Sequence, residues 1–181
     1  GIFNRAASKR QASRNGRRNT DFDFGTNPCS EIILRHLQFC NLTEVVVRAD
    51  DTFETLAEKV KLATILGTFQ STLTHFPYLR KAWKENTEEE RLLGVSLTGQ
   101  MDNKSFVSGK IDEEELKYIT IKTNKEYADI LGINPSTAIT CVKPSGTVSQ
   151  LVDSASGLHA RHSPYYIRSV RGDNKDPLTV F

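Results

Sequence analysis

The feature that most constrains the fold is a strand pattern that runs directly into a long helix pattern. Residues 40–49 contain the β-branched run VVV and predict a strand that ends before two aspartates. Residues 50–73 then repeat apolar side chains at helical spacing, with Thr52 at the expected N-cap. The expected apolar face consists of Phe53, Leu56, Val60, Ala63 and Leu66 or Gly67. A strand followed by such a helix favours parallel pairing with the next strand through a right-handed crossover.

Later segments repeat this alternation. The sequence TEEER predicts a charged loop that leads to a short buried strand at residues 92–97. Residues 112–133 predict a second helix, acidic at its start and closed by Gly132. Residues 136–152 predict a strand, a Pro-Ser-Gly turn and the start of another helix. We therefore expect an α/β layer of three or four strands and three helices, too few strands to close a barrel alone.

Composition narrows the class of protein. The 181 residues suit one domain, and 38% hydrophobic residues with a net charge of +2 exclude a disordered chain. No apolar run reaches the roughly 18 residues that a membrane span needs. Three cysteines predict a reducing compartment, with the cytoplasm as the default. Because the chain begins without Met, we expect it to be a fragment or a processed piece.

Residues 1–26 form a basic lead-in segment. Six basic residues precede the first acid, Asp21, and these are Arg5, Lys9, Arg10, Arg14, Arg17 and Arg18. Such a cluster indicates either contact with phosphate or a solvated loop or helix face, and we favour the second interpretation. No aromatic residue separates the charges, which argues against a platform for single-stranded nucleic acid.

The sequence NPCSE holds the first thiol, Cys29, which we place on a tight loop because Asn27 and Pro28 precede it. Cys40 opens the next strand, eleven positions later, so the two thiols are able to approach across a cavity. Two buried small hydrophobes are one interpretation, but this leaves the flanking Asn and Glu unexplained. A zinc site with His36 lacks the usual ligand spacing and a fourth ligand. A hydrolytic thiol needs a histidine base, and no histidine stands in a recognised pattern.

These motifs together resemble a known family. NPCSE followed by a cysteine and NL resembles the active-site finger loop of ribonucleotide reductases. The Cys29–Cys40 spacing, the turn VKPSGT and the segment SASGLHARHSPYYIRSVR are similar to the adenosylcobalamin-dependent (class II) ribonucleoside-triphosphate reductases. The resemblance implies that residues 1–181 are a single partial catalytic domain. That domain is expected to be the C-terminal half of a ten-stranded α/β barrel with a cysteine-bearing finger loop.

The resemblance implies a role for each residue of the loop. Cys29 is expected to carry a thiyl radical that abstracts the ribose C3′ hydrogen, and Glu31 to take the 3′-hydroxyl proton. Asn27 is expected to bind the ribose hydroxyls, and Cys40 to deliver a reducing hydrogen at C2′. The loop departs from the family's common pattern at Ser30, where glycine is usual.

A second implied site lies at the turn VKPSGT. On its own, a Gly turn before a helix is more often a plain N-cap than an anion site, although helix N-termini do bind phosphate. In the reductases that the sequence resembles, this turn binds the substrate's phosphates. We therefore assign substrate binding to Ser145, Gly146, Thr147, Val148 and Lys143. Cys141, in the strand before the turn, is expected to be a core thiol, and Tyr165 and Tyr166 packing or pocket residues.

The expected partners follow from the same resemblance. They are a ribonucleoside triphosphate as substrate, adenosylcobalamin as cofactor and the remainder of the reductase chain. A thioredoxin-type reductant would act through C-terminal cysteines that lie outside these residues, as does the disulfide partner of Cys40. The isolated piece is expected to show no turnover. Two alternatives stay open: a diphosphate reductase that needs a radical-generating subunit (class I), and a nucleotide- or nucleic-acid-binding module with inert thiols.

Overall fold

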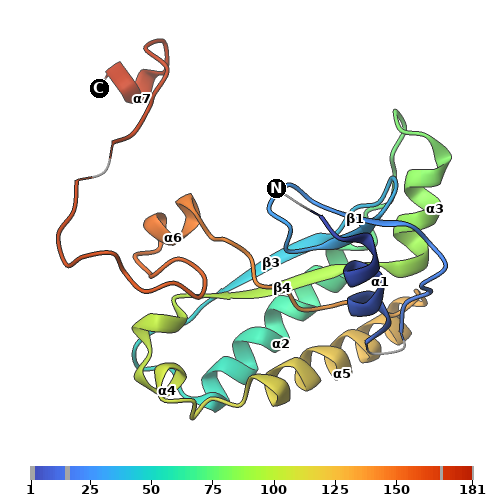
Figure 1. Cartoon of the computed structure of the whole chain (residues 1–181), viewed down its shortest axis with the longest axis horizontal. Coiled ribbons are helices and arrows are strands. Elements are labelled where there is room, and N and C mark those ends of the chain that lie inside the picture. The colour runs from blue at the N-terminus through green and yellow to red at the C-terminus, as the bar shows by residue number, and fades with distance from the viewer. Residues whose placement is uncertain (1–2, 15–16, 168, 181) are drawn as a thin grey trace.

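The computed structural model describes residues 3–14, 17–167 and 169–180. Its elements follow in the order α1 (Arg5–Ser13), β1 (Phe24–Thr26), β2 (Ile33–Arg35), β3 (Asn41–Val46), α2 (Phe53–Gln70), α3 (Lys81–Glu90), β4 (Leu93–Thr98), the 3-10 helix η1 (Gln100–Asp102), α4 (Lys104–Val107), α5 (Glu113–Leu131), α6 (Thr147–Leu151) and α7 (Pro177–Val180). Helices α2 and α5 lie against one side of the β3–β4 sheet, and the β1–β2 hairpin and α6 lie on the other side (Figure 1). No described helix is both long and apolar enough to cross a membrane.

The structure confirms the predicted parallel pairing of the strands on either side of α2. Strands β3 and β4 pair in parallel, from Asn41 opposite Leu93 to Val46 opposite Thr98. Thr52 caps α2 as predicted, because its side chain accepts a hydrogen bond from the Thr55 N–H. The core under the sheet is built by Val45, Val47, Leu56, Val60, Ile111 and Leu116.

Of the two residues predicted to complete the apolar face of α2, Leu66 or Gly67, the structure selects Gly67. Gly67 is buried and lies 3.3 Å, measured from an ideal Cβ, from a methyl of Leu93. The side chain of Leu66 is 63% exposed, and Leu62 and Leu73 are exposed as well. A glycine at the closest approach of α2 to the strand lets the helix pack near the sheet. Leu66 therefore faces away from the described core.

The charged segment before β4 is the end of helix α3 and not a loop. The helix lacks a side-chain N-cap, since Arg80 at that position makes no capping hydrogen bond. It ends at Arg91, whose φ of 44° is left-handed. The absence of a capping signal explains why the sequence pattern did not reveal this helix.

The predicted strand at residues 136–142 forms only in part. Thr140 makes a single parallel bridge with Val95. The hydrogen bonds run from the Val95 N–H to Ile139 and from the Cys141 N–H back to Val95, at 2.8 and 3.1 Å. This segment therefore lies beside β4 on the edge opposite β3. The helix α5 before it begins at its cap Asp112 and ends at Gly132, as predicted.

The basic lead-in segment is only partly solvated: Arg5, Lys9, Arg10 and Arg14 are exposed. Residues 5–13 form α1, but the two arginines at the end of the segment point inward. Arg18 is 9% exposed and binds Glu90 through two hydrogen bonds of 3.0 and 2.7 Å. Arg17 donates to the Ser136 carbonyl at 3.0 Å. For these two residues the interpretation of a solvated face is wrong.

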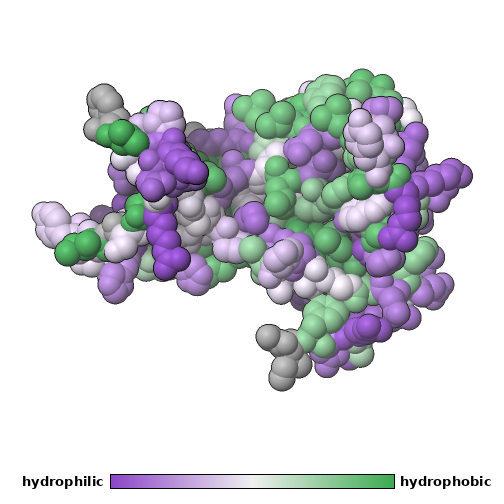
Figure 2. Space-filling model, turned by 90° about the horizontal axis from the view of Figure 1, so that it is seen from above, coloured by the Kyte–Doolittle hydropathy of each residue, from purple (hydrophilic) through white to green (hydrophobic). Residues whose placement is uncertain are grey.

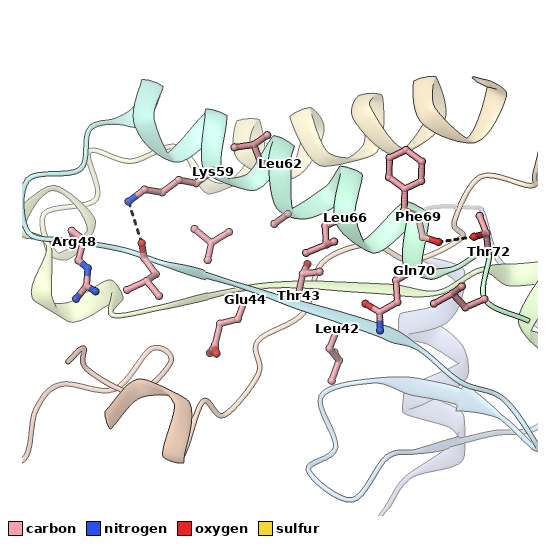
Figure 3. Close-up of a pocket in the computed structure, with 14 residues that line it drawn as sticks. Leu42, Thr43, Glu44, Arg48, Lys59, Leu62, Leu66, Phe69, Gln70 and Thr72 are labelled. Atoms are coloured by element: carbon pink, nitrogen blue, oxygen red, sulfur yellow. Dashed lines mark hydrogen bonds between the residues drawn. The ribbon is translucent and has the colours of Figure 1, made fainter. Parts of the chain in front are cut away.

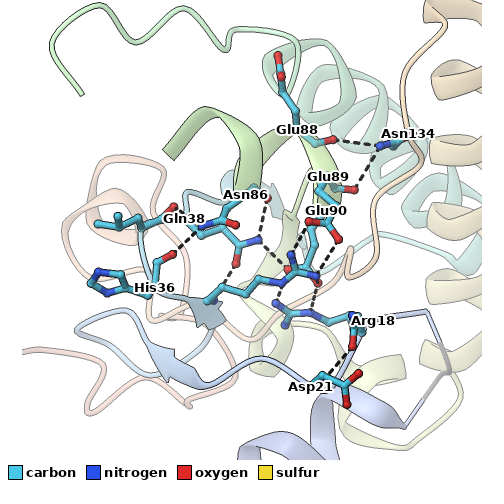
Figure 4. A network of polar contacts seen from close by, with 12 residues as sticks. Arg18, Asp21, His36, Gln38, Asn86, Glu88, Glu89, Glu90 and Asn134 are labelled. Atoms are coloured by element: carbon cyan, nitrogen blue, oxygen red, sulfur yellow. Dashed lines mark hydrogen bonds and ion pairs between the residues drawn. The ribbon is translucent and has the colours of Figure 1, made fainter. Parts of the chain in front are cut away.

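Glu90 stands at the centre of a buried ionic network (Figure 4). Its carboxylate is 1% exposed and meets Arg18 at 2.7 Å, Arg35 at 3.1 Å and the Gln38 amide at 2.7 Å. Arg35 also lies 3.7 Å above the ring of Phe22. Since Arg35 belongs to β2, this network ties the β1–β2 hairpin to the end of α3.

The C-terminal tail contacts the body through Arg161. Its guanidinium binds Asp102 through two hydrogen bonds of 3.0 and 3.1 Å, and Asp153 at 2.9 Å. Tyr165 is 91% exposed, so the prediction that it packs in a core or pocket is wrong. Tyr166 donates its hydroxyl to Gln150 at 2.5 Å and is half exposed. The tail thus contacts the body at Arg161 and Tyr166, and residues 169–180 extend away from it (Figure 1).

Candidate active site

The NPCSE motif forms the loop of the β1–β2 hairpin. Asn27 and Ile32 close the loop, because the Ile32 N–H donates to Asn27 Oδ1 at 3.1 Å and the Asn27 N–H to the Ile32 carbonyl at 3.3 Å. Cys29 sits in the turn between them and is exposed. The prediction of a tight loop is confirmed, whereas the short strands on either side were not predicted.

Ser30 occupies the one strained position of this loop. Its φ is 64°, in the left-handed region that favours glycine. The Ser30 N–H donates to the Asn27 carbonyl at 2.9 Å and closes the turn. This left-handed backbone conformation favours glycine, and any other residue in it lowers the stability by roughly 1–2 kcal/mol. Serine thus occupies a backbone conformation that glycine adopts more easily.

Glu31 lies at the inner end of the loop, and its side chain is 2% exposed. The Lys143 ammonium donates to its Oε1 at 2.9 Å. Its other oxygen, Oε2, is buried without a hydrogen-bond partner among the described residues. A buried carboxylate oxygen without a partner is costly, and such an atom often marks the place of a missing ligand. The free oxygen is able to accept a proton or a hydrogen bond.

The environment of Glu31 keeps its carboxyl group ionised. Burial alone would raise the pKa of Glu31, but the hydrogen bond from Lys143, together with its positive charge and with neighbouring backbone and amide groups, lowers it below the ordinary value. The same pair raises the pKa of Lys143. The site therefore contains a carboxylate and an ammonium at neutral pH.

The hairpin loop lies over one face of the sheet, at Gly94 of β4. Leu42 and Glu44 of β3 point to the side of the sheet away from α2 (Figure 3). Gly94 is opposite Leu42 in the register. An ideal Cβ on Gly94 would lie 3.1 Å from Cys141 Sγ and 3.3 Å from Ile32 Cδ1. The glycine thus makes room for the loop and places a third thiol on this face.

Cys40 and Cys141 are both partly buried thiols beside Glu31. Burial raises the pKa of each to about 12, and the negative charge of Glu31 contributes in both cases. Cys40 precedes β3, whereas Cys141 lies beyond the opposite edge of β4. Two strand spacings separate their Cα atoms by about 9 Å or more. A disulfide needs about 7 Å or less, so these two cysteines are not placed as partners.

The comparisons with known proteins point to one family. No family model matches the chain. An adenosylcobalamin-dependent ribonucleoside-triphosphate reductase of Lactobacillus delbrueckii subsp. bulgaricus is 30% identical over 85% of this chain and 24% of its own length. The reductase of the same name from Lacticaseibacillus paracasei is 31% identical over 98% of this chain and 28% of its own length. A crystal structure of a B12-dependent (class II) ribonucleotide reductase matches 75% of this chain and 22% of that chain, at 27% identity and a TM-score of 0.59.

This chain is similar to a segment of the adenosylcobalamin-dependent (class II) reductases. It spans about a quarter of the length of the curated relatives that it matches. The α/β arrangement of helices and parallel strands agrees with the class II reductase structure.

The turn that the reductase resemblance assigns to phosphate follows Lys143 directly. Gly146 adopts a φ of 55° and a ψ of −120°, a conformation for glycine, and its N–H donates to Ser156 Oγ at 3.2 Å. The Val148 N–H donates to the Ser145 carbonyl at 3.3 Å. Ser145 is 8% exposed, and its hydroxyl has no partner among the described residues. Thr147 is exposed at the first position of α6.

The structure brings Asn27, Glu31 and Lys143 together and places Cys40 beside them. Sequence reasoning missed the pairing of Lys143 with Glu31, and it treated Cys141 as a core thiol although it faces the site. The alternation of Cys141 and Lys143 along an extended segment was the available signal, because residues two apart share a face. Among the described residues, no group of three or more His, Cys, Asp and Glu side chains is arranged to hold a metal.

Proposed function

We propose that this chain is a catalytic segment of a class II reductase that converts ribonucleoside triphosphates to deoxyribonucleotides. The observation that carries the proposal is the buried Glu31 carboxylate, with one oxygen unpartnered, two residues from the exposed Cys29. The homology to reductases of this class supports the same conclusion. The class I alternative and the nucleotide- or nucleic-acid-binding alternative have no comparable support.

The proposed chemistry assigns one role to each residue. A thiyl radical on Cys29 takes the hydrogen atom from ribose C3′, which regenerates the thiol and leaves a carbon radical. Glu31 accepts the 3′-hydroxyl proton at its free Oε2, and the 2′-hydroxyl leaves as water after it takes a proton from a thiol of the reducing cysteine pair. Cys40 supplies a reducing hydrogen at C2′, and its sulfur forms a disulfide with the partner cysteine. Glu31 then returns its proton to the 3′-oxygen, and C3′ takes its hydrogen atom back from the Cys29 thiol. The pKa of Cys40, about 12, keeps it in the thiol form that its hydrogen transfer requires.

Asn27 is proposed to position the ribose. Its Oδ1 already accepts the Ile32 N–H, so its side-chain NH₂ is the group available for a substrate hydroxyl. Ser145, Gly146, Thr147 and Val148 are proposed to hold the phosphates, with the unpartnered Ser145 hydroxyl as the donor that the described structure leaves free.

Adenosylcobalamin is the proposed cofactor. When bound, it supplies the radical that removes the hydrogen atom from Cys29 Sγ. The exposure of Cys29 in the turn of the loop fits this requirement, because a buried thiol would be out of reach of a cofactor. The other residues assigned above are proposed to bind the substrate and not the cofactor.

We also propose that residues 1–181 are part of one larger catalytic domain, as in a ten-stranded barrel whose finger loop is NPCSE. Within the part of the chain that the structure describes, β3 pairs with β4 alone. Along its other edge runs a groove of about 1130 Å³, lined by residues of β3 and by residues of α2 that include Leu62, Leu66 and Phe69 (Figure 3). Hydrophobic residues also gather in the right half of the face shown in Figure 2. An unpaired edge beside an apolar groove is a surface that another strand and helix would cover.

The redox partners belong to the same proposal. Since Cys141 is not placed to pair with Cys40, the disulfide partner of Cys40 is proposed to come from the remainder of the reductase chain. A thioredoxin-type reductant acting on C-terminal cysteines would then restore the thiols. The cytoplasm is the compartment that we propose, on the ground of the cysteine content.

The test uses the longer enzyme that contains this chain. The purified enzyme is incubated with a ribonucleoside triphosphate and a dithiol, with and without adenosylcobalamin, and deoxynucleotide is measured. We expect formation of deoxynucleoside triphosphate only when the cofactor is present. Formation from diphosphates without the cofactor, in the presence of a radical-generating subunit, would show that the enzyme belongs to class I.

A further inference from the structure

Lys143 was expected to be a phosphate ligand, yet its ammonium is engaged elsewhere. It lies 2.9 Å from Glu31 Oε1, and the two residues are 112 positions apart in the sequence. Its own side chain is 29% exposed, whereas that of Glu31 is 2% exposed. The contact therefore joins an almost fully buried carboxylate to a cation that water still reaches.

We infer that Lys143 is a positioning residue, which holds Glu31 in the charged form with Oε2 free for the substrate. This inference rests on the proposed function. It assigns Lys143 a contact with Glu31 in place of the contact with the substrate's phosphates that the sequence predicted. Lys143 itself transfers no proton: the proton passes from the 3′-hydroxyl to Glu31, and the ammonium stays protonated.

The backbone fixes Lys143 in this position. Its N–H donates to Ser96 Oγ of β4 at 2.9 Å, in the segment that pairs with the edge of the sheet. The loop that carries Glu31 is fixed separately, by the Asn27–Ile32 hydrogen bonds. Two independently anchored segments thus meet at this ion pair. A carboxylate held in one rotamer loses less freedom when the substrate binds.

Among the described residues, Lys143 is the one cation that lies within ion-pair distance of Glu31. The thiols Cys40 and Cys141 face Glu31, and both stay protonated at neutral pH because their pKa is about 12. Arg14, Arg17, Arg18 and Lys117 line the same cavity as Glu31. Of these, Arg17 and Arg18 already bind Ser136 and Glu90. Loss of Lys143 would leave burial as the main influence on Glu31, and burial raises a carboxyl pKa.

The test compares Lys143→Met with the wild type in the longer enzyme. Lys84→Met is the control, because Lys84 also pairs with a carboxylate, that of Glu88 on α3, and does not line the cavity of Glu31. The first readout does not depend on activity. Infrared difference spectra against Glu31→Gln in each background follow the protonated carboxyl band of Glu31 as the pH falls. We expect this band to appear about 1–3 pH units higher in Lys143→Met than in the wild type or in Lys84→Met.

The second readout is the pH dependence of kcat/KM. We expect the fall of kcat/KM in acid to begin at a higher pH in Lys143→Met, by the same number of pH units. Lys143→Arg should restore the wild-type pH profile. An unchanged Glu31 titration, with a higher KM for the triphosphate at every pH, would overturn the inference and return Lys143 to a phosphate ligand. Absence of cofactor-dependent reduction in the wild type would instead count against the proposed function, while the infrared result would still decide the role of Lys143.

Discussion

Replacement of Cys29 by serine is expected to abolish nucleotide reduction in the enzyme that contains this chain. An O–H bond is much stronger than an S–H bond, so a hydroxyl at this position cannot hold the unpaired electron. We expect the rate to fall by at least about 10³-fold, as for other residues on which a reaction depends entirely. The substrate dissociation constant should not change, because the thiol lies in the turn of the loop and contributes no phosphate contact.

Cys141→Ser is the matched control for this variant. Cys141 faces the same site and is exchanged for the same residue, but no step is assigned to it. The Cys141→Ser enzyme should still reduce ribonucleotides. A Cys29→Ser enzyme that still forms deoxynucleotide at a comparable rate would contradict the assignment of the radical to Cys29.

Replacement of Glu90 by glutamine is expected to have the largest effect on stability. The variant leaves the guanidinium groups of Arg18 and Arg35 buried without their shared carboxylate. Breaking a buried ion pair on one side costs about 3–5 kcal/mol. Urea denaturation of the chain, followed through the fluorescence of its single tryptophan, Trp83, measures the loss. This residue stacks on Phe39 at 4.5 Å, close to the network.

The pH dependence of this effect has a defined sign. Burial would raise the pKa of Glu90, but the hydrogen bonds from Arg18 and Gln38 outweigh it and lower the pKa. A carboxyl group with a depressed pKa stabilises the fold above its unfolded pKa, and this contribution is lost as the pH falls through the folded value. The difference between wild type and variant should therefore be largest near neutral pH and shrink in acid.

Glu85→Gln provides the control, because it removes an exposed carboxylate that pairs with Lys81 at 2.8 Å on the same helix. An exposed pair of this kind contributes roughly 0–1 kcal/mol. Equal urea midpoints for the two variants would show that the Glu90 network does not hold the hairpin.

The parts of the fold that the sequence predicted are those with local signals. Helix α2 was predicted from its cap at Thr52, and α5 from its acidic start and from Gly132. The loop position of Cys29 followed from the residues before it. In each case the determining contacts lie within a few residues along the chain, where spacing and residue type are informative.

The remainder depends on contacts between distant segments. Strands β1 and β2 have three residues each, too few for an alternating pattern to show. Arg18 was interpreted as part of a solvated cluster because its partner, Glu90, lies 72 residues away. The pairing of Lys143 with Glu31 crosses 112 residues. No local pattern distinguishes a lysine that binds phosphate from one that binds a buried carboxylate.

The most direct test of the central claim is a crystal structure of the longer enzyme with a bound ribonucleoside triphosphate. We expect Cys29 Sγ within about 4 Å of ribose C3′ and the free oxygen of Glu31 within hydrogen-bond distance of the 3′-hydroxyl. A ribose bound away from the hairpin loop, or a Glu31 carboxylate that points away from the sugar, would contradict the account.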